Sequence, residues 1–347
     1  MHEITPKPQS AGILPSIDGN VVEGGEKSFQ AKIFRLGDRI AKVYDRMHLY
    51  GLVDLRDDSV RQELMKRELT CLSSLSPGLE ARIEPVKLGD GSTEAALTMR
   101  CLQPTDFLDC QLATGRVPTP EALTRLAKIV ADFHFDPTCA PQARLDHEGL
   151  CGFLTARLEG MEAELREYGD TDQIEAAQKT LLDDIFLRAK VAVTGMKSEL
   201  LHMQEELSEP VIGHGDLKTQ NLAITEQQEI FVLDSAPYSA WQINTRGMDA
   251  AFLRVELQLL GHAALADHFR DAHRSACISK LAERQIDVEK MPTLDAAVRL
   301  TEEIGGLLRA AIFYRLTFLG VDPERRDPAL QLMRSYTDRA VQIACKS

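Results

Sequence analysis

The sequence predicts an α+β protein of two lobes: a small antiparallel sheet with one main helix, followed by a larger and mostly helical lobe. Three observations lead to this prediction. The length of 347 residues suits two lobes rather than one. A strand-type pattern runs to about residue 102, and helical periodicity dominates from Pro104 onward. We therefore expect lobes at 1–102 and 103–347, joined by one crossing near residues 99–104.

The strands of the first lobe are expected to be short and consecutive. Between SFQAKIF and RIAKVYD lie Gly37 and Asp38, a pair suited to a two-residue hairpin loop. A helix is expected at about 59–75, followed by strand candidates at IEPVKL and EAALTM. Pairing of such neighbours in the chain makes a small antiparallel sheet the natural outcome.

The second half changes from helix to hairpin and back. Thr119 and Pro120, a cap and a first-turn proline, begin a helix whose apolar spacing runs through LTRLAKIVADF. Two short apolar runs, Leu222–Ile224 and Ile230–Leu233, are joined by TEQQE and predict a hairpin. Further helices are expected at about 152–168, 171–206, 247–275, 293–318 and 327–344.

Composition excludes several classes of protein. The formal net charge of -13 argues against nucleic-acid binding, which relies on clustered Lys and Arg. It could suit a cationic substrate, but an acidic soluble protein is the simpler and favoured explanation. No apolar segment approaches the roughly 18 residues of a membrane span, and the first residues lack a secretory signal pattern.

The seven cysteines are scattered and form no C-x-x-C pair. We expect reduced thiols in a cytoplasmic protein.

The loop GHGDLKTQN and the hairpin after it carry the candidate chemistry. Asn221 precedes the first hairpin strand and Asp234 follows the second, so antiparallel pairing should place them side by side. Their oxygens suit Mg²⁺, which takes one or two protein ligands and completes its shell with water and phosphate. Asp216, five residues before Asn221, is then left to accept the proton of an attacking hydroxyl.

These residues match the pattern H-x-D-x-x-x-x-N followed by a strand that ends in Asp, which is typical of a kinase catalytic loop. His214 would hold the loop by packing and hydrogen bonds. Lys218 could touch the γ-phosphate or lie in solvent. Asp249, in RGMDAAFL, begins an apolar helix, where its carboxylate can cap backbone amides and brace the loop.

Phosphoryl transfer also needs a positive group in the first lobe, and Lys42 in IAKVYD is the candidate. It lies inside a predicted strand, on the face that it shares with Tyr44, and a buried ammonium is costly unless paired. Glu68 supplies the partner because it falls within the apolar stripe of the predicted helix, whereas Glu63 lies on the solvent face. An ordinary structural salt bridge remains an alternative.

Gly24 and Gly25 in VVEGGEKSF directly precede a strand. Their backbone amides could approach phosphate oxygens, or the pair could form only a turn.

HGDLKTQN, FVLDS and DAAFL together resemble the aminoglycoside phosphotransferase and choline kinase-like branch of the protein kinase-like superfamily. KRELTCLSSLSPGL, IEPVKL, TMRCLQPTDFLD and LAKIVADFH are similar to successive segments of an uncharacterised bacterial family of aminoglycoside phosphotransferase-like enzymes. The resemblance spans roughly residues 20 to 260 and implies a bilobal protein kinase-like fold, with ATP and Mg²⁺ as cofactors. It makes Asp216 the base, Asn221 and Asp234 the Mg²⁺ ligands, and Lys42 with Glu68 the phosphate anchor. It also places adenine against backbone groups of the crossing strand, near Met99 and Cys101.

We therefore expect an ATP-dependent kinase that phosphorylates a hydroxyl of a small molecule, such as an amino sugar, sugar or nucleoside-like metabolite. Ser235 and Ala236 replace the Phe-Gly of protein kinases, and the segment from Asp234 to Asp249 is too short for a long activation loop. Both features favour a small-molecule kinase. A protein kinase, or a nucleotide-binding regulator without turnover, remains an alternative. The sequence does not predict the acceptor or the oligomeric state.

Overall fold

The structure is a computed structural model that describes residues 21–22, 26–27, 31–46, 48–49, 53–89, 91–136, 155, 159, 187, 190–191, 194, 211–235, 243–244 and 248–285. The chain divides into two compact units. Unit 1 comprises Met1–Arg125 and Asp216–Trp241, and unit 2 comprises Leu126–Gly215 and Gln242–Ser347. The predicted lobe boundary between residues 102 and 103 stays a prediction.

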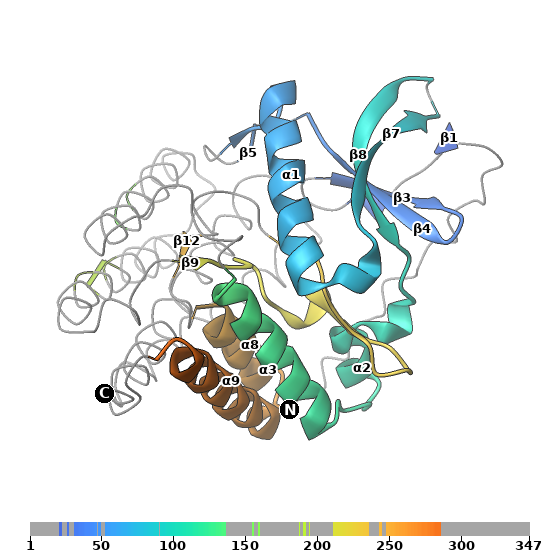
Figure 1. Ribbon diagram of the computed structural model, residues 1–347. Coiled ribbons are helices and arrows are strands. Elements are labelled where there is room, and N and C mark those ends of the chain that lie inside the picture. The colour runs from blue at the N-terminus through green and yellow to red at the C-terminus, as the bar shows by residue number, and fades with distance from the viewer. Residues whose placement is uncertain are drawn as a thin grey trace, which may run out of the picture. The chain divides into compact units, whose positions relative to one another are not determined.

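The main feature of unit 1 is a six-stranded sheet with the order β1-β7-β8-β4-β3-β2 (Figure 1). Every neighbouring pair is antiparallel except β1 and β7, so the predicted α+β class with a small antiparallel sheet is confirmed. The strands are β1 (Val21–Val22), β2 (Glu26–Lys27), β3 (Ala31–Leu36), β4 (Arg39–Tyr44), β7 (Arg82–Leu88) and β8 (Thr93–Arg100). Two more short strands, β5 (His48–Leu49) and β6 (Val53–Asp54), pair with each other.

The turn between β3 and β4 is the predicted two-residue loop. Gly37 has a φ of 62°, a left-handed conformation that glycine adopts without steric cost. The register that follows pairs Ile33 with Lys42, and Lys42 in turn with Leu97 of β8. Lys42 therefore lies on a central strand, with its backbone fixed from both sides.

Helix α1 (Asp58–Leu75) covers one face of this sheet and agrees closely with the predicted range of 59–75. Asp57 caps it by accepting the Ser59 N–H at 2.8 Å. Its buried face carries the predicted stripe, with Glu68 set among Leu64, Leu72 and Leu75. Because these apolar residues pack toward the sheet, Glu68 is carried into the interior with them.

The predicted hairpin is also present in unit 1, as β10 (Leu222–Ile224) and β11 (Ile230–Val232). Its side chains join one apolar core with α1 and β8, including Leu72, Leu97 and Phe231. The Ser76 hydroxyl accepts the Val232 N–H at 2.6 Å and donates to the Val232 carbonyl at 3.0 Å. Gln111 donates to the Ile224 carbonyl at 2.7 Å. These bonds tie both hairpin strands to the rest of unit 1.

Short helices complete unit 1. They are the 3₁₀ segments η1 (Pro77–Leu79), η2 (Pro104–Asp106) and η4 (Thr219–Asn221), and the α-helix α2 (Leu108–Ala113). Asp106 lies buried in η2 and accepts the Gln103 N–H at 3.0 Å, which makes it a local cap.

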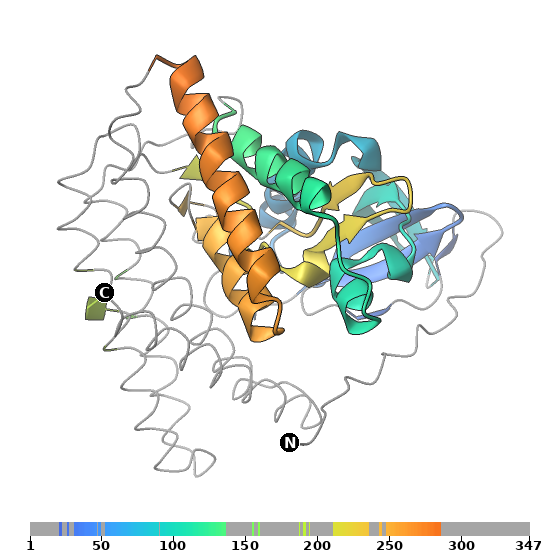
Figure 2. The ribbon, with the colours of Figure 1, turned by 90° about the horizontal axis from the view of Figure 1, so that it is seen from below.

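In unit 2, α8 (Met248–Leu259) and α9 (Ala263–Glu283) run beside α3 (Pro120–His134), whose first turns belong to unit 1 (Figure 2). Strands β9 (Val211–Ile212) and β12 (Ile243–Asn244) pair with each other. An ion pair of 2.8 Å between Lys280 and Asp132 links α9 to α3.

The prediction of one continuous helix over 247–275 is wrong, since two helices replace it. Gly261 has a φ of 85°, and the His262 N–H donates back to the Leu257 carbonyl at 2.8 Å. This left-handed glycine ends α8 in the manner of a C-terminal cap. Gly261 was the signal in the sequence, because a glycine after the last periodic residue marks a helix end.

Several predictions lie outside the described residues, namely Gly24, Gly25 and the helices at 293–318 and 327–344. Of the helices at 152–168 and 171–206, only the isolated positions named above are described, and these are helical. In the part of the chain that the structure describes, no helix combines the length and apolar content that crossing a membrane requires. Four cysteines within that part carry free thiols, namely Cys71, Cys101, Cys110 and Cys277.

Candidate active site

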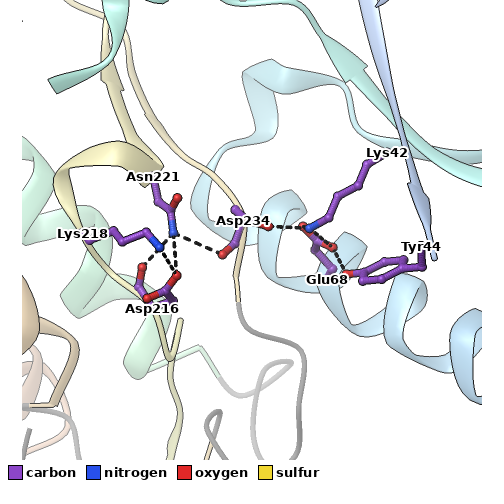
Figure 3. Close-up of polar contacts among 7 residues, drawn as sticks. All are labelled: Lys42, Tyr44, Glu68, Asp216, Lys218, Asn221 and Asp234. Atoms are coloured by element: carbon purple, nitrogen blue, oxygen red, sulfur yellow. Dashed lines mark hydrogen bonds and ion pairs between the residues drawn. The ribbon is translucent and has the colours of Figure 1, made fainter. Parts of the chain in front are cut away.

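Lys42 is the centre of a buried ion cluster in unit 1. Its side chain is only 5% exposed, and Nζ donates to both Glu68 carboxylate oxygens, at 2.9 and 3.0 Å. Nζ also contacts Oδ1 of Asp234 at 2.5 Å (Figure 3). Burial opposes the charge on Lys42, but the two carboxylates raise its pKa above the ordinary value. The predicted pairing of Lys42 with Glu68 is therefore present, and the ammonium is shared with a second carboxylate.

Glu68 has a further donor that the sequence analysis did not predict. The Tyr44 hydroxyl donates to Oε2 of Glu68, and the Tyr44 ring lies 5.0 Å from Lys42 Nζ. Burial raises the pKa of Glu68, whereas Lys42 and Tyr44 act in the opposite direction. Glu63, the rejected alternative, is exposed and pairs with Arg67 at 3.0 Å, as the helical pattern indicated. The signal for Tyr44 was its spacing of two residues from Lys42, which puts both side chains on one face of the strand.

Asp234 follows β11 and adopts a φ of 54°, in the left-handed region that Asp tolerates better than most residues. Its side chain is 44% exposed, so it faces solvent as well as Lys42. Partial burial acts to raise the pKa of Asp234, but Lys42 outweighs this effect and lowers the pKa below the ordinary value. Asp234 is thus an ionised carboxylate that is partly open to solvent.

The hairpin brings Asn221 next to Asp234, as antiparallel pairing predicts. The Leu233 N–H donates to the Asn221 carbonyl at 2.8 Å, just beyond the ends of both strands. The Asn221 amide nitrogen donates to the Asp216 carbonyl at 2.9 Å, to Oδ2 of Asp216 at 3.1 Å and to the Asp234 carbonyl at 3.5 Å. Lys218 Nζ lies 2.7 Å from Oδ2 of Asp216. Asn221 therefore bridges the two aspartates (Figure 3).

The oxygen donors of this group fit a hard divalent cation. Asp216, Asn221 and Asp234 offer carboxylate and amide oxygens, the ligand types that Mg²⁺ prefers. Among the described residues, no group of three or more His, Cys, Asp or Glu side chains is arranged to bind a metal ion. The arrangement thus suits an ion that takes few protein ligands and completes its shell with water and phosphate oxygens. It does not resemble a closed structural site.

A second polar cluster, in unit 2, holds the start of the GHGDLKTQN segment. Asp249 accepts the His214 N–H at 2.7 Å and the Gly215 N–H at 2.9 Å, which confirms the predicted brace. His134 Nε2 lies 2.8 Å from the same carboxylate. Burial acts to raise the pKa of Asp249, but the hydrogen bond from His134 and the other donors lower it to about 2. The chain passes directly from Gly215 to Asp216, so Asp249 fixes the backbone one residue before the candidate base.

His134 was missed by the sequence analysis. It ends α3 at the end of the apolar stretch LAKIVADF and is 4% exposed. A histidine on the apolar face of a helix requires a buried polar partner, and that requirement was the available signal.

Met99 and Cys101, the residues predicted to lie against adenine, both belong to unit 1. Met99 is 4% exposed and forms part of the core between α1 and the hairpin. The Cys101 N–H already donates to the Asp38 carbonyl at 2.9 Å. The contact of adenine with backbone groups of this segment stays a prediction.

No protein-family model and no curated protein sequence matches the chain. Among solved structures, the chain is similar to a choline kinase from Cryptosporidium parvum, at 13% identity over 94% of this chain and 89% of that chain, with a TM-score of 0.61. It is also similar to an ethanolamine kinase from Plasmodium vivax, at 12% identity over 92% and 81% of the two chains and a TM-score of 0.58. A choline kinase from Streptococcus pneumoniae matches at 12% identity over 93% and 92%, with a TM-score of 0.55. At these identities the likeness shows the fold.

Proposed function

We propose that this protein, which has the protein kinase-like fold shared by those choline and ethanolamine kinases, is an ATP- and Mg²⁺-dependent kinase acting on a hydroxyl of a small molecule. One observation carries the proposal. Five side chains from segments far apart in the sequence gather within unit 1, namely Lys42, Glu68, Asp216, Asn221 and Asp234. A purely structural salt bridge between Lys42 and Glu68 would not require the other three.

The charges of the cluster support phosphate transfer. Lys42 and Lys218 contribute two ammonium groups, while Glu68, Asp216 and Asp234 contribute three carboxylates. The cluster is therefore short of positive charge, and a divalent ion beside Asp234 would correct this. Bound Mg²⁺ would offset the negative charge of the transferring phosphate oxygens. Asn221 and Asp234 would hold it, and Lys42, steadied by Glu68, would bind the nucleotide phosphates.

We assign the role of the base to Asp216. In the transfer, a bond forms between the acceptor oxygen and the γ-phosphorus, and the bond from that phosphorus to the β,γ-bridging oxygen breaks. Asp216 orients the acceptor hydroxyl and takes up its proton. His214 positions the loop, because its backbone N–H donates to Asp249. Lys218 lies next to Asp216 and would contact the γ-phosphate. We assign adenine to the segment around Met99 and Cys101, and phosphate covering to Gly24 and Gly25.

The acceptor is proposed to be small. The short segment between Asp234 and Asp249 leaves little chain for a regulated activation loop. The similar structures are named for kinases of choline and ethanolamine, which are amino alcohols, and the net charge of -13 would suit a cationic acceptor of that kind. We therefore add amino alcohols to the amino sugars, sugars and nucleoside-like metabolites as candidate acceptors. We place the enzyme in the cytoplasm, without a nucleic-acid or membrane partner.

The test is transfer of label from [γ-³²P]ATP to amino alcohols, amino sugars, nucleosides and a metabolite extract, with products identified by mass. We expect Mg²⁺-dependent labelling of a small molecule. Asp216→Asn should lower kcat by roughly 10²- to 10⁴-fold, the usual contribution of a general base, and leave ATP affinity nearly unchanged. Asp267→Asn, at a half-exposed position on α9, is the matched control.

Two other outcomes would each reject the proposal. Label that appears only in polypeptides would indicate a protein kinase. Binding of Mg²⁺ and ATP without any consumption by the wild-type protein would indicate a regulator.

A further inference from the structure

Glu68 has more hydrogen-bond donors than a simple ion pair requires. Its carboxylate is 1% exposed and accepts two bonds from Lys42 and a third from the Tyr44 hydroxyl. A buried carboxylate is costly unless such donors surround it. Tyr44 is itself only 3% exposed, so its hydroxyl is removed from bulk water and directed at Glu68.

The two donors of Glu68 differ in what else they contact. Lys42 is shared, because its ammonium also contacts Asp234 at 2.5 Å. In the proposed reaction it would be shared once more, with the nucleotide phosphates. The Tyr44 hydroxyl points at Glu68 from the side opposite Asp234 (Figure 3). Tyr44 can therefore keep its bond to Glu68 whether the Lys42 ammonium contacts Asp234 or a nucleotide phosphate.

The backbone makes this arrangement rigid. Tyr44 and Lys42 are separated by one residue on β4, so both side chains leave the same face of the strand. Tyr44 pairs with Ala31 of β3, and Lys42 pairs with Ile33 of β3 and Leu97 of β8. The Tyr44 ring also lies 5.0 Å from the Lys42 ammonium, within the range of a cation–π contact. Strand β4, the Tyr44 ring and the Tyr44 hydroxyl together restrict the movement of Lys42 and Glu68, the pair that would bind the phosphates.

We propose that Tyr44 is a positioning residue for nucleotide binding: it anchors the Glu68 carboxylate, and Glu68 in turn holds the Lys42 ammonium where the ATP phosphates bind. The inference rests on the proposed function, and it names a third member of the phosphate anchor in addition to Lys42 and Glu68.

The first test is Tyr44→Phe, which removes the hydroxyl and keeps the ring. The KM for ATP should rise about tenfold, which corresponds to about 1.4 kcal/mol, with kcat changed by less than about threefold. Thr225→Val is the matched control, because it removes a buried hydroxyl of unit 1 that accepts the Glu229 N–H at 3.1 Å, at a position outside the proposed nucleotide site. The control should leave the KM for ATP unchanged.

A double-mutant cycle shows whether Tyr44 acts through Glu68. In a Glu68→Gln background, Tyr44→Phe should change the KM for ATP by less than about threefold. An equal effect in both backgrounds would overturn the proposal, since Tyr44 would then act independently of Glu68. So would an unchanged KM in Tyr44→Phe alone. A structural role would lower the melting temperature of the variant without this dependence on Glu68.

A second readout needs no nucleotide. The acylation rate of Lys42 by an N-hydroxysuccinimide ester, followed by mass spectrometry, reports how firmly its ammonium is held. Tyr44→Phe should raise this rate several-fold, the effect should shrink in Glu68→Gln, and the exposed Lys32 should be labelled equally in all variants. If Tyr44→Phe leaves the acylation rate of Lys42 unchanged, the proposed anchoring of Glu68 by Tyr44 is refuted, even where the variant fails to bind ATP. A wild-type protein that neither binds nor consumes ATP, but shows the coupled labelling, would refute only the proposed function.

Discussion

Replacing Asp249 by Asn changes one atom of a carboxylate that has three donors. Oδ2 accepts the His214 N–H and contacts His134 Nε2, while Oδ1 accepts the Gly215 N–H. The asparagine oxygen can take only one of these two positions. If it replaces Oδ2, the side-chain NH₂ group takes the position of Oδ1 and faces the Gly215 N–H, so that two hydrogen-bond donors face each other. The substitution is nearly isosteric, so its effect reports hydrogen bonding and charge rather than packing.

The expected cost follows from that geometry. One buried N–H loses its partner, which costs about 1–3 kcal/mol, and the remaining two bonds fall from charge-assisted to neutral strength, a loss of about 1–3 kcal/mol together. Asp249→Asn should therefore lower the free energy of unfolding by about 2–6 kcal/mol, a range centred on the about 3–5 kcal/mol seen when one partner of a buried charged pair is removed. Because Gly215 precedes Asp216, kcat should fall more than the affinity for ATP.

The assay is urea unfolding followed by circular dichroism at neutral pH, with Asp271→Asn as the control. Asp271 is exposed, lies in the same helix bundle and bonds to neighbouring Arg270, so its substitution should cost little. A loss below about 1 kcal/mol for Asp249→Asn would refute the reasoning, because at least one of the three donors would then need no acceptor in the folded protein.

Two further predictions concern stability. Burial lowers the pKa of His273 to about 3, with the neighbouring His134 also lowering it and Asp249 opposing. Below about pH 6.5 the His273 imidazole binds a proton in the unfolded protein but stays neutral in the folded protein, so acid favours unfolding. Between pH 6.5 and 4.5, the free energy of unfolding should therefore fall by about 2–3 kcal/mol more in the wild type than in His273→Phe. Parallel pH curves for the two proteins would contradict this. Ser76→Ala removes the hydroxyl that satisfies both the N–H and the carbonyl of Val232. Urea unfolding should show a loss of about 2–4 kcal/mol, whereas Ser73→Ala on the exposed face of α1 should cost less than about 0.5 kcal/mol, and equal losses would refute the assignment.

Local patterns predicted the elements that position the site. The apolar stripe placed Glu68, and not Glu63, on the buried face of α1, because a helix repeats its face every 3.6 residues whatever surrounds it. The two short apolar runs predicted the β10–β11 hairpin, whose antiparallel pairing places Asn221 beside Asp234. The break at Gly261 was missed because the apolar pattern continues on both sides of it, while the backbone conformation that ends α8 depends on a single residue.

The sequence by itself determined which residues are candidates for the chemistry, since the spacing within HGDLKTQN and FVLDS, and the periodicity of the helix and strands, are properties of short segments. Only the tertiary structure decided how those segments share their charges. Lys42 holds Glu68 and Asp234 together, Tyr44 joins them from the same strand, and His134 joins Asp249 across a sequence separation of 115 residues. Such contacts arise when burial brings distant polar groups together and each must then find a partner, a requirement that no local pattern expresses.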